Sequence, residues 1–190
     1  MKNIIFQQCQ TVVDDTLYPI SNISNILAIL YHEFAHINWA GLYYCDNENQ
    51  ECILGPFQGK VACTKIPYHK GVVGTCAASK KMIVVDNVHQ FDGHIACDHS
   101  SKSELVIPLI YNNELLAILD IDSDQYNNFD QDTVETILEI SYILSSLFQV
   151  NHLPSLQLRP ASCRCCSPGQ NRGQRRADKY CCGFPQQFPD

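Results

Sequence analysis

Arginine is missing from the first 158 residues of this chain, which hold seven lysines against 18 acidic residues. Nucleic-acid binding needs clustered lysine and arginine to neutralise phosphates, so this acidic balance argues against a nucleic-acid partner. The same charge is compatible with a small cationic or zwitterionic ligand. All five arginines lie beyond residue 158.

Apolar runs of the roughly 18 residues that a membrane span needs are also missing, so we expect no membrane association. The start, Met1-Lys2-Asn3, soon meets Asp14 and Asp15 and lacks the charged-then-apolar order of a signal peptide. We therefore expect a cytoplasmic protein, in which thiols stay reduced and cysteines indicate chemistry more often than disulfide staples.

Cysteine and charge divide the chain into two regions. Five of the 11 cysteines lie in the last 28 residues, among prolines and glycines and without a helical or alternating apolar pattern. Such a composition does not offset the conformational entropy of folding. We expect residues 1–151 to form one folded domain and residues 152–190 to form a disordered tail rich in cysteine, arginine and proline.

The pattern of apolar residues in the folded region predicts a helix, a hairpin, a short strand, a second hairpin and a last helix. Helical spacing covers 22–34, with Ser21 as its cap. Alternation predicts strands over 39–44, 52–54, 104–111 and 115–121, and residues 81–86 indicate a short buried strand. Asp130 is expected to cap the last helix. One face of that helix is expected to hold Val134, Ile137, Leu138, Ser141, Tyr142, Ser145 and Phe148. This order predicts an α+β fold, an antiparallel sheet with helices on one side.

Three carboxylates gather on the second predicted hairpin. Asp120 and Asp122 are two residues apart on a strand and so point to the same face, and Glu104 can lie across from them. Three like charges this close raise one another's pKa unless a cation lies among them. The pattern favours a site for an ammonium group or a metal ion, and a solvated acidic surface is the alternative.

One thiol stands out by its surroundings. Cys97 lies in a loop that begins with a glycine and is flanked by His94 and Asp98. A nearby histidine can lower the pKa of a thiol, and the thiolate is the reactive form. Cys97 is therefore interpreted as a reactive thiol, with a buried structural thiol or a metal ligand as alternatives. The remaining cysteines of the first hairpin and the N-terminal segment are interpreted as packing residues: Cys9, Cys45 and Cys52.

The runs GPFQGKVACTKIPYHKGVVGT, DNVHQFDGHIACDHSSKSELVIPL and LDIDSD resemble the free methionine-R-sulfoxide reductases, GAF-domain enzymes of bacteria and lower eukaryotes. The resemblance covers about residues 20–148. It implies a GAF-type antiparallel sheet with helices mainly on one face and active-site loops on the other. It also implies thiol-dependent reduction of free L-methionine-(R)-S-oxide to methionine, without a metal or an organic cofactor.

By that resemblance, Cys97 attacks the sulfoxide and becomes a sulfenic acid, Cys63 forms a disulfide with it, and a thioredoxin-type reductant restores both thiols. The resemblance assigns substrate binding to three groups of residues: Glu104, Asp120 and Asp122 at the α-ammonium, Trp39 and Tyr43 at the sulfoxide methyl, and backbone amides near Ile95 and Ala96 at the carboxylate. It also suggests a homodimer.

One position departs from the family pattern. A third cysteine, in GVCG, is replaced here by Val73, so only the assignment of attack to Cys97 can operate. Cys76 would share a face with Val73 if a helix begins there. Cys76 is thus a candidate auxiliary thiol, or more simply a packing residue. Two other functions stay open: a GAF module that binds a small ligand without catalysis, and a metal-binding protein that uses His94, Cys97 and the tail cysteines.

Overall fold

The computed structural model describes residues 2–91, 93 and 100–148. The predicted tail, 152–190, lies outside the described residues. In chain order the elements are α1 (Lys2–Thr11), α2 (Pro19–Glu33), β1 (Ile37–Asp46), β2 (Glu51–Gly59), β3 (Lys65–Pro67), α3 (Gly71–Ser79), β4 (Ile83–Val85), the 3₁₀ turn η1 (Val88–Gln90), β5 (Ser103–Tyr111), β6 (Glu114–Ser123) and α4 (Gln131–Leu147).

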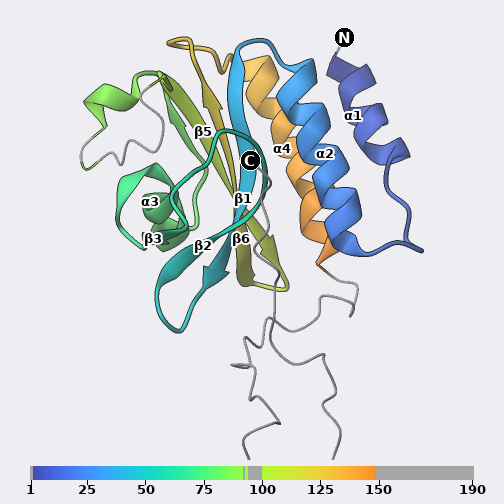
Figure 1. Cartoon of the computed structure of the whole chain (residues 1–190), viewed down its shortest axis with the longest axis horizontal. Helices are drawn as coiled ribbons and strands as arrows, with labels where there is room; N and C mark the ends of the chain where they lie inside the picture. Colours follow the sequence, from blue (N-terminus) through green and yellow to red (C-terminus); the bar gives the residue numbers. More distant parts are fainter. Residues whose placement is uncertain (1, 92, 94–99, 149–190) are drawn as a thin grey trace, which may run out of the picture. The chain divides into compact units, whose positions relative to one another are not determined.

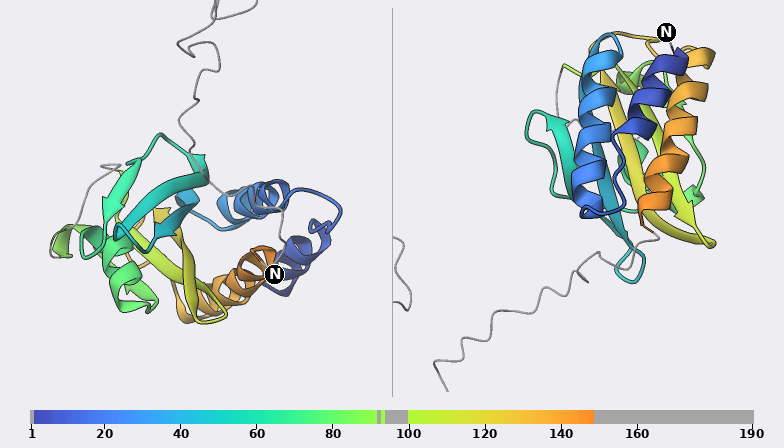
Figure 2. Two further views of the ribbon diagram at one scale, coloured as in Figure 1. Left: turned by 90° about the horizontal axis from the view of Figure 1, so that it is seen from below. Right: turned by 90° about the vertical axis from the view of Figure 1, so that its right-hand side faces the viewer.

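The strands form one six-stranded antiparallel sheet in the order β3-β2-β1-β6-β5-β4. Helices α1, α2 and α4 cover one face, and α3 lies on the other (Figure 1). Seen from the helix side, α1, α2 and α4 run next to one another across the sheet (Figure 2). The predicted α+β architecture is confirmed, with helices mainly on one face. No helix within the described ranges combines the length and the apolar content needed to cross a membrane.

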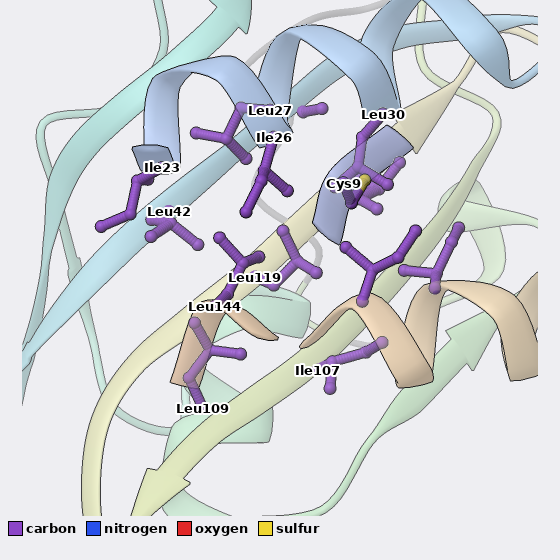
Figure 3. Packing of buried hydrophobic residues seen from close by; sticks show 14 of the residues in the cluster. Cys9, Ile23, Ile26, Leu27, Leu30, Leu42, Ile107, Leu109, Leu119 and Leu144 are labelled. Atoms are coloured by element: carbon purple, nitrogen blue, oxygen red, sulfur yellow. The ribbon is translucent and has the colours of Figure 1, made fainter. Parts of the chain in front are cut away.

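The main core lies between the three helices and the sheet. Leu27 and Leu30 of α2 point toward Leu42 and Leu119 on the strands, and Leu144 of α4 closes the layer (Figure 3). Each of these side chains is fully buried. Full burial of a leucine stabilises a fold by about 1.5–3 kcal/mol, so this layer supplies much of the driving force for folding.

The last predicted helix, α4, begins where the sequence indicates, whereas the first predicted helix, α2, begins earlier than predicted. Asp130 caps α4, and its carboxylate accepts a 2.7 Å hydrogen bond from the Thr133 amide. Ser21 is not a cap, because α2 begins at Pro19 and Tyr18 precedes it without a side-chain hydrogen bond. Proline suits the first turn of a helix, where its missing amide proton would have no partner.

Three other predictions are corrected. Tyr142 was expected to share a face of α4 with Ile137 and Ser141 but is 66% exposed, whereas Ile140, Leu144 and Leu147 pack in the core. β2 continues to Gly59, beyond the predicted strand 52–54. The predicted strand 81–86 is shorter, at the sheet edge, and only Val85 of its three residues is buried.

Candidate active site

The sheet face opposite α1, α2 and α4 carries the predicted carboxylates. Glu104 on β5 pairs directly with Asp122 on β6, and Asp122 pairs with Trp39 on β1. Asp120 lies two residues along, opposite Gly41. Directly opposite residues of an antiparallel pair point to the same face, so these groups form one continuous surface. The neighbouring residues Leu119 and Ile121 point to the opposite face and enter the helix-side core.

The three carboxylates crowd together in a nearly dry environment. One oxygen from each of Glu104, Asp120 and Asp122 lies within 4.8 Å of the others. Glu104 is 5% exposed and Asp120 is 6% exposed. Burial, the two aspartates and the hydrogen bond shared with Asp120 raise the pKa of Glu104 well above its usual range. Burial raises the pKa of Asp120 to about 7.

One atom of this cluster lacks a partner. Asp120 Oδ1 is buried and accepts no hydrogen bond within the described residues. A buried acceptor without a donor costs about 1–3 kcal/mol, more if it is charged. The arrangement therefore favours a cationic donor among the carboxylates, as the sequence predicted, and both an ammonium group and a divalent cation meet this need.

Aromatic side chains of β1 and β2 lie beside the carboxylates. This aromatic wall consists of Trp39, Tyr43 and Phe57. Trp39 stacks on Tyr43 with ring centroids 5.8 Å apart and on Phe57 with centroids 5.5 Å apart. The Trp39 indole nitrogen donates a 3.1 Å hydrogen bond to the Lys60 carbonyl, which fixes the ring. Burial and the three carboxylates raise the pKa of the Tyr43 hydroxyl, so this phenol remains protonated beside them. Phe57 could not be placed in the site from the sequence, because the predicted strand ended at residue 54.

The described cysteines near this face fall into two kinds. Cys63 lies in the loop after β2, is partly buried and is disulfide-bonded. Cys76 is a free thiol on α3 that is fully buried, and its Sγ lies 3.9 Å from the Val106 carbonyl oxygen. A helix does begin near Val73, and Val73 and Cys76 both pack in the same cluster under α3. Burial raises the pKa of Cys76 above its usual range.

Cys97, Ile95 and Ala96 lie outside the described residues, but both ends of their loop are described. The Gly93 carbonyl accepts a 3.2 Å hydrogen bond from the Gly71 amide at the start of α3. On the other side, the Asn38 amide donates to the hydroxyls of Ser100 and Ser101, each at 3.1 Å. Asn38 directly precedes Trp39, so these bonds tie Ser100 and Ser101 to the β1 segment that carries the aromatic wall. No signal in the sequence alone indicated that Asn38 makes these hydrogen bonds.

The family model described as GAF domain matches residues 21–149. The chain is 45% identical over 114 residues to the free methionine-R-sulfoxide reductase of Escherichia coli, covering 60% of this chain and 68% of that protein. It is 40% identical over 132 residues to the Saccharomyces cerevisiae protein of the same name, covering 66% of this chain and 73% of that protein. The solved structure of the Neisseria meningitidis free methionine-R-sulfoxide reductase in complex with its substrate superposes with a TM-score of 0.71 at 35% identity. That match covers 77% of this chain and 86% of the other. The chain therefore belongs to the GAF domain family and, within it, to the free methionine-R-sulfoxide reductases.

Proposed function

We propose that this protein reduces free methionine-R-sulfoxide to methionine, with Cys97 as the attacking thiol and Cys63 as the resolving thiol. The observation that carries the proposal is the buried carboxylate cluster, with its unpartnered Asp120 Oδ1, beside the stack of Trp39 and Tyr43. The names of its relatives and of its structural neighbours support the same reaction.

The carboxylates suit the α-ammonium group of a free amino acid. An ammonium donates three hydrogen bonds and would place a positive charge among Glu104, Asp120 and Asp122. In a peptide this nitrogen is an uncharged amide, so the buried carboxylates would stay uncompensated and the peptide would be rejected. The rings of Trp39 and Tyr43 exclude water and make favourable contacts with a methyl group or sulfur.

The thiol steps balance without a cofactor. The Cys97 thiolate attacks the sulfoxide sulfur, the oxygen takes up a proton and passes to Cys97, and methionine leaves with sulfur reduced by two electrons. Cys97 is left as a sulfenic acid. The Cys63 thiolate attacks the Cys97 sulfur, the S–O bond breaks and water leaves as the disulfide forms. A thioredoxin-type dithiol then reduces that disulfide by exchange. The disulfide-bonded state of Cys63 supports a redox role for this thiol.

The test is NADPH oxidation coupled through thioredoxin reductase and thioredoxin, with free methionine-R-sulfoxide, the free S epimer, or a peptide-bound sulfoxide. We expect turnover with the free R epimer alone. Cys97→Ser abolishes it, and Cys63→Ser retains a single turnover but not recycling by thioredoxin. Cys9→Ala serves as the matched control, because Cys9 is buried in the opposite, helix-side core.

Two results would contradict the proposal. Activity that survives Cys97→Ser would remove Cys97 from the reaction. Binding of methionine sulfoxide, measured by calorimetry, without turnover of any substrate by folded protein would favour the alternative of a non-catalytic ligand-binding GAF module. Calorimetry with Mg²⁺ or Zn²⁺ distinguishes an ammonium site from a metal site in the carboxylate cluster.

The homodimer, the cytoplasmic location and the disordered tail stay predictions from the sequence.

A further inference from the structure

Two free thiols that the proposed reaction does not use face each other on the first hairpin. Cys45 on β1 is the direct register partner of Cys52 on β2, and both side chains lie in the cluster on the α3 side of the sheet. Directly opposite residues of an antiparallel pair have Cα atoms about 4.5 or 5.5 Å apart. Disulfides span Cα separations of about 4.4–6.8 Å, so the backbone here already meets that requirement.

The two thiols differ in the way that the partners of a redox pair differ. Cys52 is fully buried, whereas Cys45 is partly exposed. The neighbouring Cys52 thiol and, after it, the Tyr68 hydroxyl lower the pKa of the Cys45 thiol, and the contact with Cys45 together with burial raises the pKa of Cys52. Lower pKa and exposure mark the thiol that reacts first, and the buried neighbour is placed to resolve it.

A pocket of about 460 Å³ provides a route toward Cys45. Its lining includes Tyr68 together with Asn47 and Gln50, which lie in the turn of the hairpin. The Tyr68 hydroxyl donates a 2.9 Å hydrogen bond to Asn47 Oδ1 and also interacts with the Cys45 thiol. Cys45 thus lies one side chain behind the pocket wall, within reach of a small oxidant.

We propose that Cys45 and Cys52 are a second redox pair, oxidised by peroxide to a disulfide across β1 and β2. The Cys45 thiolate attacks one peroxide oxygen, the O–O bond breaks, and Cys45 becomes a sulfenic acid as the other oxygen leaves as water. The Cys52 thiolate then attacks the Cys45 sulfur, the S–O bond breaks, and a second water leaves. Two thiols lose two electrons in total, and one hydrogen peroxide becomes two waters.

This pair is independent of the proposed sulfoxide reaction, because its oxidant is a peroxide and neither thiol belongs to the assigned catalytic set. It also modifies the interpretation of Cys45 and Cys52 as packing residues: both do pack, but their pairing gives them a chemical role. Cys9, which packs on the other sheet face without a neighbouring thiol among the described cysteines, offers a contrast in the same chain.

The experiment exposes the folded full-length protein to hydrogen peroxide, alkylates the remaining thiols on unfolding, and maps the cysteines by mass spectrometry. Cleavage after glutamate and lysine yields peptides 34–48 and 52–60, each with one cysteine. We expect these two peptides to be joined by a disulfide that reductant separates. In Cys52→Ser, dimedone should label Cys45. In Cys45→Ser, Cys52 should stay a thiol, and Cys9 should be alkylated throughout.

Three outcomes would overturn the proposal. The first is full alkylation of Cys45 and Cys52 at peroxide doses that oxidise other thiols of the chain. The second is a disulfide from Cys45 to a cysteine other than Cys52. The third is a link between 34–48 and 52–60 that forms in urea but not in folded protein, because the proposal rests on the native strand register. Circular dichroism of each variant establishes that folded protein is compared.

Discussion

The indole ring of Trp39 lies over the Cα atom of Gly41, two residues along the same strand. A Cβ atom on Gly41 would stand 2.4 Å from Trp39 Cη2 and 2.6 Å from the Cβ of Phe57. Both separations are far below van der Waals contact, so the stacked wall is possible only because residue 41 has no side chain. Asp120 is the register partner of Gly41, so the glycine that accommodates the ring lies directly opposite a carboxylate of the site.

Gly41→Ala is expected to displace Trp39 and raise the KM for free methionine-R-sulfoxide by roughly 10-fold or more, because a misplaced group weakens positioning. Coupled NADPH oxidation measures the effect. Trp39→Ala removes one of the two side chains that the new methyl would meet, so the double variant should lose less than the sum of the single losses. Strict additivity would show that Gly41 does not act through Trp39.

Asp120→Asn is expected to raise the KM for the free sulfoxide by about 10–100-fold, because a buried charge partner of the ammonium is lost. The amide has nearly the shape of the carboxylate, so packing is preserved. Asp124→Asn is the matched control, since Asp124 follows the end of β6 and its side chain is 48% exposed. An unchanged KM in Asp120→Asn would remove this residue from substrate binding.

The ligand-free protein should lose stability as the pH rises from about 4 to about 7. Asp120 has a pKa of about 7 when folded against 3.8 in the unfolded chain, so between these values the folded state holds the extra proton. Stability is then greatest below the unfolded pKa and falls as the folded carboxyl ionises. Urea unfolding across this range should show the slope, and Asp120→Asn should flatten it and stabilise the protein at neutral pH by about 1–3 kcal/mol. A slope equal to that of wild type would exclude Asp120 as its origin.

Cys76→Ala should keep turnover within about twofold while lowering the free energy of unfolding by about 1–2 kcal/mol, because it removes buried volume under α3. The buried thiol with its raised pKa fits a packing role better than an auxiliary nucleophile. Kinetics and urea unfolding of the same preparation separate the two roles. A large fall in turnover with unchanged stability would restore Cys76 as an auxiliary thiol.

The sequence predictions that succeeded depended on the period of apolar residues and on local turn chemistry. Asp120 and Asp122 could be placed on one face because strand alternation has a period of two. The turn at Asn112 and Asn113 was also predictable, and both residues adopt positive φ angles, as the tight turn between β5 and β6 requires. Pairing partners such as Trp39 with Asp122 could not be predicted, since register depends on contacts between distant segments.

Two misses have identifiable causes. The segment Lys2–Thr11 is short and has three glutamines and a threonine among its apolar residues, so packing against α2 and α4 is needed to stabilise it as α1. Pro56 is unusual in a strand, yet in the part of the chain that the structure describes β3 pairs with β2 only at Glu51–Ile53, so Pro56 lies on an edge beyond this pairing. A proline that lacks an amide proton is tolerated on such an edge.

The register shift between β1 and β2 determines which side of the sheet receives Phe57. Tyr43 pairs with Leu54 and Gly41 pairs with Phe57, so β2 contains one more residue than β1 over this interval. Strict alternation would turn Phe57, three residues after Leu54, toward the helix layer, and the register shift returns it to the face of Trp39. A one-codon deletion at Gly55 or Pro56 would place Phe57 two residues after Leu54, so the shorter strand would need no irregularity to keep the same ring on the same face.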